Sequence, residues 1–79
     1  MALVSSIEHV SRDQAKVHKP TRCTYFEFLD HDDKRYLQFD TYGSEDRQFP
    51  DKTSQSMQFD ESAARQVLTI IREVFPNLT

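Results

Sequence analysis

The sequence predicts an α+β fold, a curved antiparallel sheet of three or four strands followed by one C-terminal helix packed on one face. Between residues 21 and 59, apolar and polar side chains alternate in segments rich in Tyr, Phe and Thr, which indicates strands with one buried face. After residue 60, apolar side chains recur at intervals of three and four, which is typical of an amphipathic helix. The chain has 79 residues, and we expect a single domain over residues 1–79.

Residues 1–20 have the least regular pattern. Leu3, Val4, Ile7 and Val10 fit a short helix as well as an irregular strand. We expect a first strand somewhere within Val4–Lys16, and the alternative is a partly flexible arm.

Residues 21–29 and 35–42 form a predicted hairpin with a loop of four or five residues around the polar turn 30–33, because Asp residues favour turns and the flanking segments are rich in aromatic residues. Alternation divides each strand into two faces. The predicted core face carries Phe26, Phe28, Leu37 and Phe39. The other face carries Cys23, Tyr25, Glu27, Tyr36, Gln38, Asp40 and Tyr42.

A polar loop of about eleven residues leads to the last predicted strand, residues 54–59. Met57 and Phe59 extend the core face of this strand, whereas its other face is polar. Asp60 is a candidate N-cap, because its carboxylate can accept from the first amides of a helix. The predicted helix runs for about fifteen residues and ends before Pro76.

The predicted helix carries more apolar residues than one sheet face needs. One stripe consists of Ala64, Val67, Leu68, Ile71 and Phe75. The adjacent stripe, which is the predicted homodimer interface, consists of Ala63, Val67, Ile70 and Val74. Symmetric helix-to-helix pairing is the simplest way to cover this stripe, and the alternative is that the N-terminal segment covers it.

Composition argues against several classes of protein. One cysteine, Cys23, allows no internal disulfide, and with no signal-peptide pattern it indicates a cytoplasmic protein. No apolar run is long enough for a membrane span. Asp30 and His31 lie in a turn without a second ligand group, so we predict no metal and no other cofactor. Cys23 has no orienting carboxylate or nucleophile elbow nearby in sequence, so we predict no enzymatic activity.

The charge is unevenly distributed along the chain. The net charge is −3. Residues 1–22 carry four basic and two acidic side chains, and residues 23–61 carry four basic and ten acidic side chains. This balance is unlike that of a general nucleic-acid binder, although a local basic rim is still compatible with it.

The polar sheet face is the candidate site. Its tyrosines offer stacking surfaces for bases, its amides can bond base edges, and nearby cations can meet phosphates. The candidate nucleic-acid-binding residues are Lys16, Lys19, Arg22, Tyr25, Lys34, Arg35, Tyr36, Gln38, Tyr42, Arg47, Lys52 and Gln58. The alternative is an ordinary solvent-exposed face of an antiparallel sheet, and Glu27 and Asp40 on this face count against nucleic acid.

A resemblance is carried by Tyr36-Leu-Gln-Phe-Asp-Thr-Tyr42, by the polar loop Ser44-Glu-Asp-Arg-Gln, by Lys52, and by Met57-Gln-Phe-Asp-Glu61. At the level of pattern, the chain resembles the single-stranded-DNA-binding coactivator family of positive cofactor four. The resemblance implies a homodimer formed through the helices and curved sheet faces that bind unpaired strands. The chain departs from the family in Tyr42, where a tryptophan is frequent, and in its acidic charge.

Two hypotheses follow for the function. The first is a non-enzymatic, homodimeric protein that binds single-stranded DNA or RNA, with a role in transcription or another DNA transaction. The second is a small regulatory protein-interaction module, such as an accessory or inhibitor protein, whose acidic surface over residues 23–61 faces a basic partner.

Overall fold

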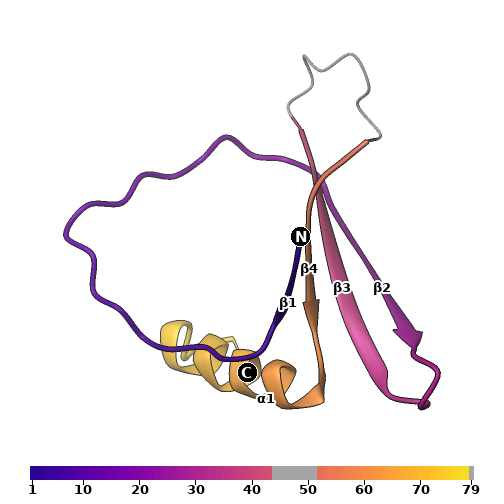
Figure 1. The fold of residues 1–79 in the computed structure, drawn as a ribbon. Helices are drawn as coiled ribbons and strands as arrows, with labels where there is room; N and C mark the ends of the chain where they lie inside the picture. Colours follow the sequence, from indigo (N-terminus) through magenta and orange to yellow (C-terminus); the bar gives the residue numbers. More distant parts are fainter. Residues whose placement is uncertain (44–51, 79) are drawn as a thin grey trace.

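The computed structural model describes residues 1–43 and 52–78, which form an open four-stranded sheet followed by one helix (Figure 1). The elements are β1 (Ala2–Val4), β2 (Cys23–Leu29), β3 (Arg35–Tyr42), β4 (Thr53–Phe59) and α1 (Glu61–Val74). The strand order is β1-β4-β3-β2. Strands β2, β3 and β4 pair antiparallel, whereas β1 is parallel to β4, so the sheet is mixed. The predicted α+β class is confirmed.

The first strand is shorter and lies earlier than predicted. Only Ala2–Val4 is a strand, in register with Met57, Gln58 and Phe59 of β4. Residues 5–22 form neither helix nor strand, and this irregular segment curves away from the sheet before it returns to β2 (Figure 1). The expected strand within Val4–Lys16 is therefore wrong, because this polar stretch lacks the alternation that would bury one side of a strand.

The hairpin between β2 and β3 is closed by Asp30. Its Oδ1 accepts from the backbone N–H groups of Asp32, at 2.8 Å, and of Lys34, at 3.0 Å. Asp33 has a φ of 60°, a left-handed conformation that Asp tolerates better than most residues. The hydrogen bond from the Lys34 N–H is the main cause that lowers the pKa of Asp30 below its usual value.

The pairing of β2 with β3 overturns the predicted faces of β2. Tyr25 lies opposite Phe39, and Phe26 lies opposite Gln38. Directly paired residues share a face, so Tyr25 points to the side of Phe39 and Phe26 points to the other side. Of the two loop lengths that the sequence allows, the expected faces require the four-residue connection, residues 30–33, whereas the structure pairs Leu29 with Arg35 across the five-residue connection, residues 30–34. One extra residue moves every side chain of β2 to the opposite face.

We name the two sides of the sheet by what lies on them. The helix face, on the side of α1, carries Tyr25, Glu27, Leu37, Phe39, Met57 and Phe59. The open face carries Thr24, Phe26, Phe28, Tyr36, Gln38, Asp40, Tyr42, Ser56 and Gln58.

Asp60 joins β4 to α1 as the predicted N-cap. Its Oδ1 accepts from the N–H of Ala63 at 2.8 Å, and α1 then runs for 14 residues. The predicted cap and helix are confirmed. In the part of the chain that the structure describes, no helix has the length and apolar character needed to cross a membrane.

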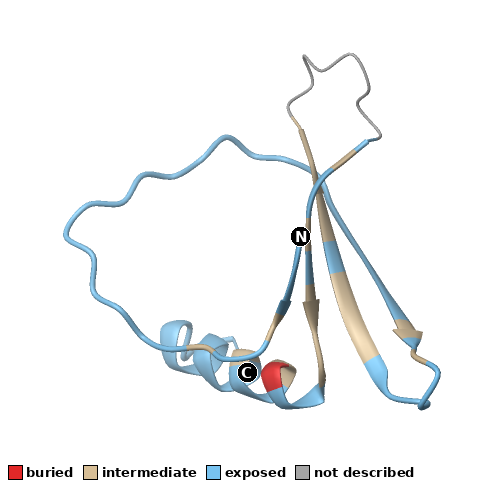
Figure 2. Ribbon diagram, viewed as in Figure 1, coloured by how far each residue is buried: buried red, intermediate tan, exposed pale blue. Residues whose placement is uncertain are grey.

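The helix covers little of the sheet. It meets the sheet chiefly at β4, and among the described residues only Ala63, with 3% of its surface exposed, is buried (Figure 2). Phe39 and Met57 on the helix face remain 37% and 47% exposed. The apolar side chains that should form the core of one chain therefore border an open recess between the helix face and α1.

Candidate nucleic-acid interface

Cross-strand pairing arranges the open face in three rows. Phe28 of β2 lies opposite Tyr36 of β3. The next row contains Phe26, Gln38 and Gln58, and the third contains Thr24, Asp40 and Ser56. Two of the aromatic side chains thus lie at the hairpin end of the face, Phe26 lies in the middle row, and the other side chains of the middle and third rows are polar.

The aromatic end of the face is a connected group of three rings. The ring centroids of Phe26 and Phe28 lie 5.9 Å apart, and those of Phe28 and Tyr36 lie 5.5 Å apart with an interplanar angle of 24°. The Tyr36 hydroxyl donates to Oδ2 of Asp30 at 3.4 Å. This hydrogen bond ties the Tyr36 side chain to the turn. Phe26 is exposed, which leaves an aromatic surface in contact with solvent.

The middle of the face is a hydrogen-bonded ladder. Gln58 Nε2 donates to Gln38 Oε1 at 2.8 Å, and Gln38 Nε2 donates to Asp40 Oδ1 at 2.8 Å. Ser56 Oγ also donates to Asp40 Oδ1, at 2.6 Å. Because an ionised carboxylate only accepts hydrogen bonds, Asp40 fixes the orientation of the Gln38 amide, which in turn fixes that of Gln58.

Asp40 is a stable negative charge within this ladder. The hydrogen bond from Ser56 is the main cause that lowers the pKa of Asp40 below its usual value, and the bond from Gln38 adds to it. A carboxylate in this position is a strong acceptor for amino and amide N–H groups, and it repels phosphate.

The far end of the face holds Tyr42. Its hydroxyl lies 2.9 Å from Oγ1 of Thr24, and the guanidinium carbon of Arg22 lies 4.2 Å from its ring centroid. This distance is within the range of a cation–π contact. Arg22 therefore places a positive charge beside Tyr42, at the opposite end from the three rings.

The structure gathers some of the predicted site residues and separates others. Tyr36, Gln38, Tyr42 and Gln58 share the open face, and Arg22 contacts Tyr42. Tyr25, which is 69% exposed, and Arg35 lie on the helix face instead.

The remaining predicted cations lie at the margins. Lys34 ends the turn before β3, and Lys52 precedes β4. Lys16 and Lys19 lie in the irregular segment 5–22 and are exposed. Arg47 lies outside the described residues.

The four residues of the predicted dimer stripe differ in their environment. Ala63 is buried within the chain, and Val67 is half-buried on the side of the sheet. Ile70 and Val74 are exposed, Val74 by 61%. The C-terminal part of the stripe is therefore its most exposed part.

Sequence reasoning missed Phe26 and Phe28 as members of the open face. Alternation correctly placed them on one side of their strand, but the side was decided by the length of the turn. The Asp33 φ of 60°, within the five-residue connection 30–34, has no unique signal in a sequence where three Asp residues stand in the turn.

Comparisons of the chain with protein-family models, with curated proteins and with solved structures found no match.

Proposed function

We propose that the open face binds single-stranded nucleic acid, in a non-enzymatic role in transcription or another DNA transaction. The observation that carries the proposal is the position of three aromatic rings beside an oriented amide ladder on one face of the sheet. Stacking of a base on an aromatic side chain contributes about 1–3 kcal/mol. The neighbouring amides of Gln38 and Gln58 can bond base edges.

The charge of the face sets the expected path of the strand. Because Asp40 repels phosphate, we expect bases rather than phosphates over the ladder, with the Asp40 carboxylate accepting from exocyclic amino groups. Phosphates would lie toward Arg22 beside Tyr42 and toward Lys34 after the turn.

Titration of a labelled single-stranded oligonucleotide, followed by fluorescence anisotropy, tests this proposal. We expect binding at about 50 mM salt that weakens at about 200 mM. Tyr36→Ala should weaken binding by about 5–150-fold, the equivalent of one lost stacking contact. Tyr25→Ala is the matched control, because Tyr25 lies on the helix face, and it should leave binding unchanged. No binding at the lower salt concentration would contradict the proposal.

The proposal includes a homodimer and a cytoplasmic location. The exposed C-terminal part of the α1 stripe supports pairing, and a single cysteine, Cys23, which is free and exposed, fits a reducing compartment.

A second candidate is a regulatory protein-interaction module that binds a basic partner. The observation that favours it is the ionised Asp40 within the open face, with Asp30 bonded to Tyr36 at its edge. Capture of one protein partner that survives nuclease treatment, without binding of oligonucleotides, would favour this second function over the first.

A further inference from the structure

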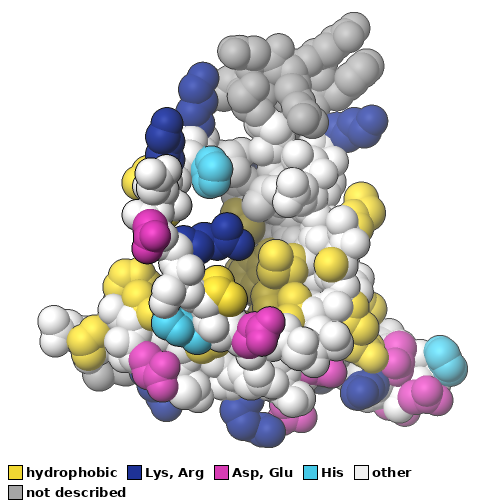
Figure 3. Space-filling model, turned by 60° about the vertical axis from the view of Figure 1, so that its left-hand side comes forward, with side chains coloured by type: hydrophobic (Ala, Val, Ile, Leu, Met, Phe, Trp, Pro, Cys, Tyr) yellow, Lys and Arg dark blue, Asp and Glu magenta, His cyan; other side chains and the backbone are white. Residues whose placement is uncertain are grey.

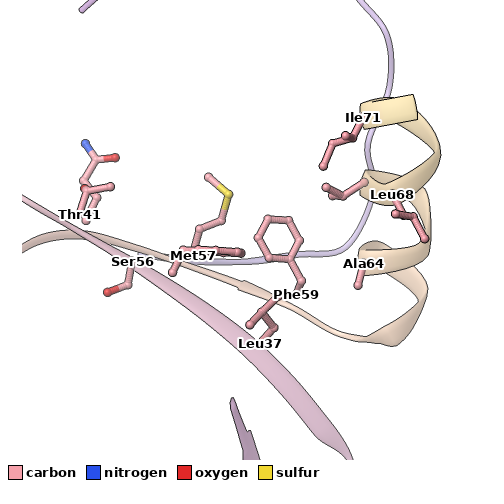
Figure 4. A pocket seen from close by; sticks show the side chains of 11 residues that line it. Leu37, Thr41, Ser56, Met57, Phe59, Ala64, Leu68 and Ile71 are labelled. Atoms are coloured by element: carbon pink, nitrogen blue, oxygen red, sulfur yellow. The ribbon is translucent and has the colours of Figure 1, made fainter. Parts of the chain in front are cut away.

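A recess separates the helix face from α1. Its volume is about 410 Å³, and Figure 4 shows Leu37, Met57 and Phe59 bordering it from the sheet and Leu68 and Ile71 bordering it from the helix. Of the described residues that line it, none is charged. Figure 3 shows hydrophobic side chains gathered in this hollow part of the surface. An apolar occupant therefore fits this mainly apolar lining.

The chain exposes more surface than a compact protein of its mass. A compact protein of 9.3 kDa exposes about 5,000 Å², whereas this chain exposes 7517 Å². The extended residues 5–22 account for part of the excess. The whole excess is about 2,500 Å², and a stable interface needs only about 800 Å² from each partner.

The radius of gyration leads to the same conclusion. It is 15.0 Å for this chain, whereas a compact domain of 79 residues has about 12 Å. The chain is therefore more extended than a compact domain of its length.

We infer that a second copy of this chain fills the recess with its own α1, so that each copy completes the core of the other. This inference rests on the homodimer of the proposed function and changes its form, because the contact is helix to sheet as well as helix to helix. The segment that fits is the exposed end of α1, with Ile70, Val74 and Phe75. Since a two-fold pair uses the same surface on both copies, each α1 both borders one recess and enters the other.

The shared core has a consequence for folding. A chain whose described residues bury only Ala63 has too little core to fold alone. Folding and pairing should therefore be one transition, and its midpoint should depend on protein concentration.

Sedimentation equilibrium and urea unfolding of the full chain, without nucleic acid, test the inference. We expect twice the mass of 9.3 kDa and an unfolding midpoint that rises as the concentration is raised from about 1 to about 100 μM. A monomer that unfolds cooperatively at a midpoint independent of concentration would overturn the inference. Because no oligonucleotide is present, the outcome is separate from that of the nucleic-acid titration.

A matched pair of variants on α1 locates the contact. Ile71→Glu places a charge in the recess, and it should weaken pairing by at least about 30-fold and reduce the helical circular-dichroism signal with it. Gln66→Glu changes an exposed position of the same helix and should leave mass and signal unchanged. A folded, monomeric Ile71→Glu variant would contradict a shared core.

Isotope-filtered NMR of a mixture of labelled and unlabelled wild-type chains detects contacts between copies. This measurement needs no variant, so it does not depend on whether a variant folds. We expect inter-copy contacts between Ile70 methyl groups of one copy and the Phe39 ring of the other. Inter-copy contacts restricted to helix against helix would overturn the proposed helix-to-sheet contact.

Discussion

Asp60 follows the last strand and caps the N-terminus of the helix through one hydrogen bond. Its Oδ1 accepts from the Ala63 N–H, a donor that would otherwise lack an intrahelical partner. Asp60→Ala should lower the free energy of unfolding by about 1 kcal/mol, whereas Asp60→Ser should retain most of it, because serine also caps helices. Urea unfolding of the three proteins at one concentration measures this difference, and equal stability of Asp60→Ala and wild type would contradict the capping role.

Asp30 gives the hairpin a dependence on pH. Its pKa is lowered in the folded chain, whereas an unfolded Asp titrates near its ordinary value of about 3.9. The stabilisation from the ionised group is therefore fully present above about pH 4 and is lost as the pH falls through the lower, folded pKa. Asp30→Asn keeps an acceptor oxygen but cannot ionise, so its stability should change less between pH 5 and acidic solution. Unfolding at a series of pH values checks this, and equal slopes for the two proteins would refute it.

At the scale of elements, the β2–β3 hairpin shows what the sequence could predict and what it could not. Alternation located both strands, and Asp60 and Pro76 bounded the helix. The face of β2 could not be predicted, because alternation within a strand says nothing about its register against the next strand. Two aromatic members of the candidate site were consequently missed, and Tyr25 was assigned to it wrongly.

The Asp40 charge in the ladder between β3 and β4 should affect what the open face binds. Asp40→Asn removes the charge but keeps the shape and one acceptor oxygen for exocyclic amino groups. It should therefore strengthen binding of a single-stranded oligonucleotide by a few-fold, since repulsion of phosphate is relieved. If the face instead binds a basic protein, the same variant should weaken that complex. Ser56→Ala, which removes one donor to Asp40 but leaves the charge, is the control in the anisotropy titration.

At the scale of the whole molecule, the two faces of the sheet have separate roles in this account. The surplus of apolar residues on the helix already predicted a partner surface. The open recess was not predictable, because it depends on how far α1 leans from the sheet, and periodicity along a helix does not determine a packing angle. The structure places Leu68 and Ile71 beside the sheet but leaves both exposed, which is why we assign the remaining contact to a second copy.

NMR can test directly whether nucleic acid binds the open face, by following backbone amide shifts as a single-stranded oligonucleotide is added. We expect the largest shifts at Phe26, Tyr36, Gln38 and Gln58, with little change at Tyr25 and Leu37. Shifts centred on the helix face, or none at about 50 mM salt where phosphate contacts are strong, would contradict it.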